Sequence, residues 1–413
     1  MDSSPRIVID PGSHAMLNLG DVAMLQVCVR RLLGRWPRAR IDVLTTAPGE
    51  LARHCPEAHP LAAEGRYRWL AAGAGGARAT LARMAGRLPG AAWVRAESAV
   101  RGLGPEVGAY LSALARADLF VMSGRGGMTD AFADEAAATL GELETAARLG
   151  VPAALLSQGM GPLDDPELRR RAARVLPGVG LFAVREARQA GRLLREVGVP
   201  DGRVAVAGDD AAELAWAAQP PEPAATGIGL SMRLSPPSRA DAAVEPVGNA
   251  VRTAARRLDC AVTSVPISLY PGRDDAALIG RMLGSPPSGV DTPAAAIAAA
   301  GGCRIVVTGT YHAAVFAAAQ GVPVVALAGS PYYDGKLSGL RDWFGSGVTL
   351  VRMDEPALGR RLGEAIEFAW ATPVEERARM LSAAERQVAA GRETYGRLAG
   401  MMRLSTTTPA TVS

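Results

Sequence analysis

Residues 304–319 read Arg-Ile-Val-Val-Thr-Gly-Thr-Tyr-His-Ala-Ala-Val-Phe-Ala-Ala-Ala. The β-branched run at 304–308 predicts a buried strand, Gly309 permits a tight turn, and the alanine-rich run from 313 predicts a helix. A strand that passes through a short turn into a helix is the repeating unit of a parallel sheet covered by helices. His312 then lies in the first turn of that helix, beyond the carboxyl end of the strand, where open parallel sheets bind their ligands.

The same alternation of strand and helix runs through the chain on both sides of this stretch. Strands are predicted at 6–10, 39–44, 118–122, 152–156, 181–184 and 204–206, and again at 227–232, 261–266, 304–308, 322–327 and 348–351. Helices are predicted at 22–33, at 131–149 and from 355 to about 401. This pattern predicts an α/β protein with two doubly wound domains that face each other across a cleft.

The stretch Gln219-Pro-Pro-Glu-Pro-Ala-Ala-Thr226 marks the boundary between the two halves, because its prolines favour a semi-rigid linker. The predicted organisation is an N-terminal domain at 1–218, a linker at 219–226 and a C-terminal domain at 227–354. C-terminal helices at 355–404 and a disordered tail at 405–413 complete it.

Composition limits the classes of function. The chain has 413 residues, 48% of them apolar, and a net charge of +4. Its basic residues are almost all arginine, with Lys336 as the single lysine, and they form no stripe interleaved with aromatics, so nucleic acid is not an expected partner. The four cysteines have no CxxC spacing, and no apolar run approaches the roughly 18 residues of a membrane span. We therefore expect a reduced, cytoplasmic protein.

Arginines concentrate between Arg66 and Arg101. A solvated helical face is the favoured interpretation of this region. The alternative is a surface that docks an anionic or lipid-linked acceptor, which would bring the protein to a membrane surface.

Three further loops sit at predicted strand ends. In Asn18-Leu-Gly-Asp21, Gly20 permits close backbone approach and the free amides of the next turn can hold an anion, although Asn18 or Asp21 could equally cap the helix. The glycine-rich loops 123–127 and 158–162 leave the backbone bare for a ligand, and a tight turn explains them as well. Their candidate residues are Gly124, Arg125, Gly126, Gly127 and Gln158.

His312 is the sharpest candidate. At a helix N-terminus the dipole favours an anionic ligand and lowers the pKa of a nearby imidazolium, which suits proton exchange beside a phosphate or carboxylate. A structural role is the alternative. His14, His54 and His59 show no comparable setting, and no spacing of histidines and carboxylates indicates a metal site.

Together these loops resemble the polysaccharide pyruvyl transferase family. The resemblance is carried by motifs in order along most of the chain: 18–21, 123–127, 158–162, Ala183-Val-Arg-Glu186, Asp209-Asp210, Gly229-Leu-Ser-Met-Arg233, Gly309-Thr-Tyr-His-Ala-Ala314, Gly321-Val-Pro-Val-Val325 and Lys336.

The resemblance implies two Rossmann-like domains in a glycosyltransferase-B-like (GT-B-like) arrangement, with the acceptor on the N-terminal side and the donor on the C-terminal side. It implies transfer of a pyruvyl group from phosphoenolpyruvate to a sugar as a ketal, with phosphoenolpyruvate as co-substrate and neither a metal nor another cofactor. By resemblance His312 is the acid or base, and Arg185 and Arg233 hold the anions. Gly309, Thr310, Tyr311 and Lys336 complete the donor site, while Asn18, Gly20, Asp21, Gly124, Arg125, Gly126, Gly127 and Gln158 form the acceptor side.

The sequence departs from the family at the histidine motif. The family usually carries Arg-Leu-His-Ala, with the arginine gripping the donor, where this chain has Thr310-Tyr-His-Ala313. Glu186 also replaces the usual aspartate after Arg185. Either another arginine substitutes (Arg125, Arg185, Arg233 or Arg273), or the donor is not phosphoenolpyruvate.

Two other functions therefore stay open. One is a glycosyltransferase-like or other transferase that uses a nucleotide-sugar or different activated donor in a natural-product or cell-envelope pathway. The other is a binding or scaffold protein on a decayed enzyme fold. The expected partners are a small-molecule donor and a saccharide or glycoconjugate acceptor; a homo-oligomer is also compatible with the sequence.

Overall fold

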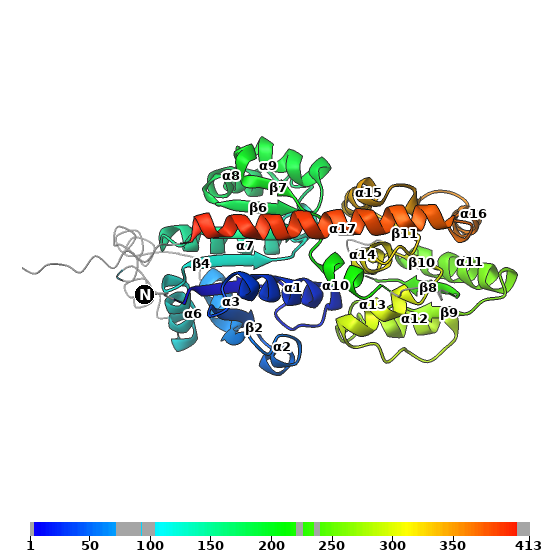
Figure 1. Cartoon of the computed structure of the whole chain (residues 1–413), viewed down its shortest axis with the longest axis horizontal. Coiled ribbons are helices and arrows are strands. Elements are labelled where there is room, and N and C mark those ends of the chain that lie inside the picture. Colours follow the sequence, from blue (N-terminus) through cyan, green and yellow to red (C-terminus); the bar gives the residue numbers. More distant parts are fainter. Residues whose placement is uncertain (1–3, 72–91, 93–103, 220–225, 235–239, 403–413) are drawn as a thin grey trace, which may run out of the picture.

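The computed structural model of the chain describes residues 4–71, 92, 104–219, 226–234 and 240–402. Within these ranges the strands form a seven-stranded sheet with the order β3-β2-β1-β4-β5-β6-β7 and a five-stranded sheet with the order β12-β11-β10-β8-β9. Neighbouring strands are parallel throughout both sheets. The two sheets lie side by side along the long axis of the molecule (Figure 1).

The first sheet and its helices come from the first half of the chain. Its strands are β1 (Arg6–Asp10), β2 (Arg40–Thr45), β3 (His59–Ala62), β4 (Leu119–Ser123), β5 (Ala153–Gln158), β6 (Leu181–Val184) and β7 (Val204–Val206). The helices are α1 (Leu19–Arg35), α2 (Pro48–His54), α3 (Ala63–Ala71), α6 (Pro105–Ala115), α7 (Ala133–Arg148), α8 (Pro166–Val175), α9 (Arg192–Glu196) and α10 (Ala211–Ala217).

The second sheet follows. Its strands are β8 (Ile228–Ser231), β9 (Val262–Ser264), β10 (Ile305–Thr308), β11 (Val324–Ala328) and β12 (Val348–Arg352). The helices are α11 (Val244–Arg257), α12 (Asp275–Leu283), α13 (Pro293–Gly301), α14 (Tyr311–Ala319), α15 (Pro331–Phe344), α16 (Leu358–Trp370) and α17 (Val374–Arg397).

All the predicted strands are present, and the sequence missed one. β3 is a four-residue edge strand that contains Pro60, a residue that sheets tolerate at their edges and that hides a strand in the sequence pattern. The helix predicted from Val22 starts earlier, at Leu19. Residues 220–225 of the predicted linker and the whole predicted tail at 405–413 lie outside the described residues.

Small residues join the two halves. Ala211, Ala212 and Ala215 of α10 share one buried cluster with Leu19 and Met24 of α1 and with helix α14, of which every residue is buried. Alanines at such a contact let helix backbones approach closely, which explains why a chain so poor in aromatics still forms a dense core.

Helix α17 runs back from the second sheet along the first (Figure 1). Its Tyr395 lies in the same apolar cluster as β1 and α1, and the Tyr395 hydroxyl donates a 2.7 Å hydrogen bond to Asp210. Arg31 of α1 pairs with Asp210 at 2.6 Å and with Glu213 at 2.5 Å. Buried charges that are paired in this way fix α1, α10 and α17 to one another.

We predicted that the arginines between Arg66 and Arg101 lie on a solvated helical face, and for Arg66 this prediction is wrong. Arg66 is buried on α3 and pairs with Glu142 at 2.8 Å and with Asp10 at 3.3 Å. Arg68 of the same helix is exposed, and the other arginines of the region, from Arg78 to Arg101, lie outside the described residues. None of the helices in the described ranges is both long and apolar enough to cross a membrane.

Candidate active site

A cavity of about 480 Å³ lies between the carboxyl ends of the two sheets. Loops after β1, β4, β6, β8, β9, β10 and β11 all contribute to its lining. The residues that line it are Gly12, Ser13, Asn18, Asp21, Arg125, Gly126, Gly127, Phe132, Glu135, Arg185, Arg233, Leu234, Ile267, Ser268, Tyr270, Pro271, Arg273, Thr310, Tyr311, His312, Tyr332, Tyr333 and Lys336. We refer to this cavity as the cleft.

Most of the candidate residues of the sequence meet here. Those that line the cleft are Asn18, Asp21, Arg125, Gly126, Gly127, Arg185, Arg233, Thr310, Tyr311, His312 and Lys336. Gly20, Gly124, Gln158 and Gly309 do not line it. The sequence missed Gly12, Ser13, Tyr332 and Tyr333, although they too follow strand ends and the same rule would have found them.

Gln158 and Gly124, which lie outside the cleft, and Asn18, which lines it, hold the neighbouring strand ends and α1 in place. The Gln158 amide donates to the carbonyls of Met122 at 3.2 Å and Leu156 at 2.9 Å, so this side chain ties strand ends together. A side chain at Gly124 would meet Met24 of α1, so glycine is needed here for the loop after β4 to approach this helix. Asn18 caps α1 by accepting hydrogen bonds from the amides of Gly20 and Asp21.

His312 sits where both halves of the chain converge. It is the second residue of α14, and its ring is buried. Its Nε2 lies 3.7 Å from Oδ2 of Asp209, and the same oxygen is 2.8 Å from Nε of Arg185. On the other side, a Cβ placed on Gly20 would lie 2.0 Å from Cγ of His312. Glycine is therefore needed in the first turn of α1 to make room for the imidazole.

The electrostatics of the cleft keep this histidine neutral. Burial, followed by the charges of Arg185, Lys336 and Arg233, places the pKa of His312 well below its ordinary value. An anion bound among these cations would offset their charge and raise the pKa of His312 again. The imidazole can therefore take up a proton when an anionic ligand arrives.

Two arginines are held rigidly for anion binding. Arg185 donates from Nε to the carbonyl of Ser157 at 2.9 Å and lies over the Tyr311 ring, 5.0 Å from its centroid. Arg233 makes two hydrogen bonds with Asp275, at 3.2 and 3.0 Å. Guanidinium groups fixed in this way are suited to carboxylate and phosphate ligands.

Lys336 and Asp21 add two groups that titrate near neutral pH. Burial and Arg185 lower the pKa of Lys336 to about 7, against the opposing charges of Asp21 and Asp209. The Lys336 ammonium contacts the hydroxyl of Tyr332. Burial raises the pKa of Asp21 to about 6, although Arg185, Arg233 and Lys336 oppose the shift.

Thr310 stands where the family usually has arginine, and its side chain is almost fully buried. It is 1% exposed, and its hydroxyl lies 2.7 Å from that of Ser231 and 3.1 Å from that of Thr308. The side chain thus ties the end of β10 to β8. The positive charge of the cleft comes instead from the loops after β4, β6, β8 and β9 and from α15.

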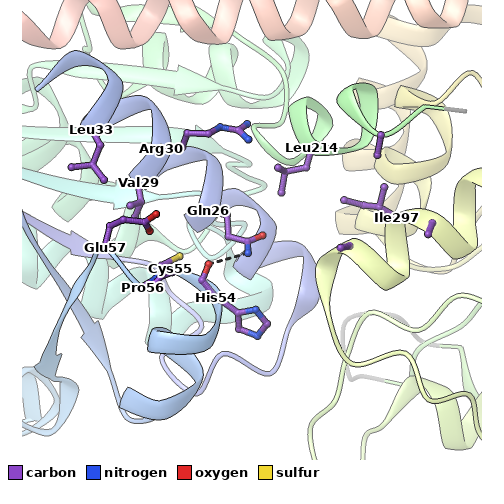
Figure 2. Close-up of a pocket in the computed structure, with 13 residues that line it drawn as sticks. Gln26, Val29, Arg30, Leu33, His54, Cys55, Pro56, Glu57, Leu214 and Ile297 are labelled. Atoms are coloured by element: carbon purple, nitrogen blue, oxygen red, sulfur yellow. Dashed lines mark hydrogen bonds between the residues drawn. The ribbon is translucent and has the colours of Figure 1, made fainter. Parts of the chain in front are cut away.

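A second, larger cavity of about 660 Å³ opens between α1, α2, α10 and α13 (Figure 2). Its lining is mainly apolar, and Gln26 crosses it to donate to the carbonyl of His54 at 3.0 Å. Arg30 pairs with Glu213 at 3.0 Å. No cluster of charges converges on this cavity among the residues described, so the smaller cleft is the stronger candidate.

Across the described part of the chain, no three side chains of histidine, cysteine, aspartate or glutamate are grouped to hold a metal ion. The cleft holds cationic side chains, which can bind anions. It also holds carboxylates and an imidazole, which can exchange protons.

Two parallel sheets that face a shared cleft through their carboxyl ends define the GT-B type of fold. Solved structures agree: the UDP-GlcNAc 2-epimerase from Neisseria meningitidis bound to UDP-GlcNAc is 12% identical, with a TM-score of 0.57 over 96% of this chain and 100% of that one. UGT89C1 from Arabidopsis thaliana complexed with UDP is 14% identical, with a TM-score of 0.56 over 97% and 100% of the two chains. At this identity the likeness shows the fold alone.

The family follows from the sequence profile of polysaccharide pyruvyl transferases, which matches residues 18–331. The chain belongs to this family and is a transferase. The match includes every cleft residue except Gly12, Ser13, Tyr332, Tyr333 and Lys336. A comparison with curated proteins gives no match.

Proposed function

We propose that this enzyme transfers a pyruvyl group from phosphoenolpyruvate to hydroxyls of a sugar or glycoconjugate, forming a ketal and releasing phosphate. The observation that supports this most is the setting of His312, a buried neutral imidazole surrounded by the positive charges of Arg185, Arg233 and Lys336. Phosphoenolpyruvate carries a carboxylate and a phosphate on one small skeleton, which matches this group of cations.

The reaction needs a proton at the methylene carbon of the enol. When the anionic donor binds, the pKa of His312 rises, and the imidazolium that forms can deliver this proton. Protonation leaves an oxocarbenium-like carbon, which a first acceptor hydroxyl attacks. The C–O bond to phosphate then breaks and a second hydroxyl closes the ketal, while the protons of the two hydroxyls pass to the now neutral His312 and to the released phosphate. Asp21, with its pKa near 6, is a second group in the cleft that can exchange a proton.

We place the donor on the side of the second sheet, beside α14 and α15, and the acceptor on the side of the first sheet. In this proposal phosphoenolpyruvate is the co-substrate and no other cofactor is required. Arg185 and Arg233 take over from the arginine that Thr310 replaces, because both are buried in the cleft wall near His312.

A nucleotide-sugar donor is the second candidate. It is favoured by the closed position of Thr310 and by two fold neighbours, the S. aureus MnaA–UDP co-structure (TM-score 0.58, 12% identity, 95% and 96% of the two chains) and UGT89C1 with UDP. In that case His312 would act as a base.

Incubation of the purified enzyme with phosphoenolpyruvate and β-galactosyl, mannosaminyl or glucuronosyl acceptors should release phosphate and yield an acceptor heavier by one pyruvyl unit. Thermal-shift measurements with phosphoenolpyruvate, nucleotides and nucleotide-sugars, run in parallel, report which donor stabilises the folded state. Stabilisation by a nucleotide-sugar alone, without phosphate release from phosphoenolpyruvate, would favour the second candidate.

Binding of phosphoenolpyruvate at pH 8 should be accompanied by proton uptake, about one proton of which goes to Lys336, because its pKa of about 7 in the empty cleft rises next to the bound anion; His312 takes up the remainder. Since less of the Lys336 ammonium is present as the pH rises above 7, donor affinity should fall over the same range. Calorimetric titrations in buffers of different ionisation enthalpy measure the proton count.

Lys336→Met should lower this proton uptake by about one proton and leave the part that His312 takes up. Arg273→Met is the matched control, because Arg273 also lines the cleft while an arginine keeps its charge at every pH used. This variant should weaken donor binding and leave the proton count unchanged. Equal uptake by the wild type and Lys336→Met would show that another group titrates.

A further inference from the structure

Lys336 is the single lysine of the chain, and it lines the cleft. Its side-chain nitrogen, Nζ, packs against the backbone of Gly126, because a Cβ on that glycine would overlap Nζ. The rings of Tyr332 and Tyr311 flank the nitrogen, with their centroids 4.2 and 5.6 Å away. The side chain is half-buried, so these neighbours hold the nitrogen in place while the cleft leaves it within reach of a small molecule.

An arginine stands beside this lysine. Nη1 of Arg185 and Cε of Lys336 lie 3.8 and 3.4 Å from the same point, the place that a Cβ on Gly159 would take. The other two nitrogens of the guanidinium are engaged elsewhere, since Nε donates to the carbonyl of Ser157 and Nη2 to the sulfur of Met24. A carboxylate bound at Nη1 would therefore bring the carbon next to it close to the lysine nitrogen.

Burial and neighbouring cations make this nitrogen a nucleophile at neutral pH. Burial and then the charge of Arg185 lower the pKa of Lys336 to about 7; Arg233 acts in the same direction, while Asp21 and Asp209 oppose the shift. A lysine in water has a pKa of about 10.4, so at pH 7 only on the order of one molecule in 2,000 is neutral. In the cleft about half of the Lys336 side chains are neutral at the same pH.

Tyr332 directs the lone pair of the neutral amine. Its hydroxyl donates a 3.0 Å hydrogen bond to the carbonyl of Gly126, so its oxygen can only accept from Lys336, whose Nζ contacts it. The amine gives one hydrogen to this contact, and its lone pair then points away from Tyr332. Desolvated lysines next to another cation are the ones that form Schiff bases with carbonyl compounds.

We propose that Lys336 forms a reversible imine with small α-keto acids, the chemical class of pyruvate. The carboxylate of the keto acid binds Arg185, and Nζ attacks the keto carbon beside it. A C=N bond replaces the C=O bond, and both hydrogens of the amine leave with the keto oxygen as water, so neither an oxidant nor a reductant is needed. Asp21, which lines the same cleft, can protonate the departing hydroxyl. The inference goes beyond pyruvyl transfer and does not depend on it.

Reduction with cyanoborohydride, which converts an imine into a stable amine, tests the inference. With pyruvate at pH 7.5 the protein should gain one carboxyethyl group per chain, on Lys336, about 100-fold faster than Nα-acetyllysine does in the same buffer, because far more of its amine is neutral. Methyl pyruvate is more electrophilic but carries no carboxylate for Arg185, so it should react at Lys336 more slowly than pyruvate. Intact mass and peptide mapping measure both rates.

The double variant Lys336→Arg/Arg273→Lys is the matched control. It keeps one lysine and the net charge, but it moves the lysine to an exposed position of the cleft lining. An exposed lysine stays protonated at pH 7.5, so the control should be modified no faster than Nα-acetyllysine. Thermal unfolding checks that both proteins are folded.

Three outcomes would overturn the inference. One is modification of the wild type no faster than that of the control, and another is modification mainly at the α-amino group of the chain. The third is methyl pyruvate reacting at Lys336 as fast as pyruvate, which would mean that Arg185 does not hold the carboxylate. Pyruvyl transfer is measured separately, by phosphate release, so the imine and the proposed function can fail independently.

Discussion

His312→Ala should lower kcat for pyruvyl transfer by about 10²–10⁴-fold, the range over which a positioned proton donor acts. The ring is neutral in the empty cleft, so its removal takes no charge from the donor site. The affinity for phosphoenolpyruvate should therefore change only slightly, and the loss should appear in kcat. Steady-state kinetics together with a donor titration separate the two quantities.

His59→Ala is the control for this experiment, because this side chain is exposed on the edge strand β3. His312→Gln refines it by nearly keeping the volume of the ring while removing the titrating group. Full turnover without His312 would show that another group in the cleft carries out the proton transfer.

Gly20→Ala, which adds one methyl group directly behind His312, should be strongly damaging. Its Cβ would lie 2.0 Å from Cγ and 2.1 Å from Nδ1 of His312, so either the ring or α1 has to move. Overpacking of this kind costs about 1–3 kcal/mol of folding free energy. A displaced imidazole loses its alignment with the donor, and we expect a fall in kcat/KM of about 10²-fold.

The same helix offers a matched control. Gly34→Ala places a Cβ where nothing lies within 4 Å, and it should stabilise α1 by about 0.5–1 kcal/mol without affecting turnover. Combining Gly20→Ala with His312→Ala removes the contacts with the ring but leaves the Cβ of residue 312 at 2.5 Å from the new methyl, so the double variant should regain only part of the lost stability while staying inactive. Full activity in Gly20→Ala would mean that the imidazole is not held as the structure shows.

The sequence was sufficient wherever a feature depends on neighbours along the chain. The run at 304–308, the turn at Gly309 and the alanines after His312 define β10 and α14, so the position of His312 followed from local pattern. The same logic placed the loop after β4 at the cleft, whereas Arg185 after β6 was found only through the family resemblance. It failed at β3, where four residues with a proline carry too weak a pattern.

Contacts between segments that are distant in the chain could not be predicted from the sequence. Arg66 is buried because it pairs with Asp10 and Glu142, which are far away in the chain. No residue near Arg66 in the sequence indicates these ion pairs. Asp209 approaches His312 only because the two sheets face each other. The role of Thr310 depends on Ser231, which the pairing of β8 with β10 places beside it.

The path of α17 has a consequence for how the protein is made. Tyr395 and Leu398 belong to the same apolar cluster as β1 and α1, which the ribosome synthesises first. The N-terminal half must therefore wait, with part of its apolar surface uncovered, until nearly four hundred residues have been translated. The two halves cannot mature as independent units, and a nascent chain of this protein needs protection from aggregation until its last long helix emerges.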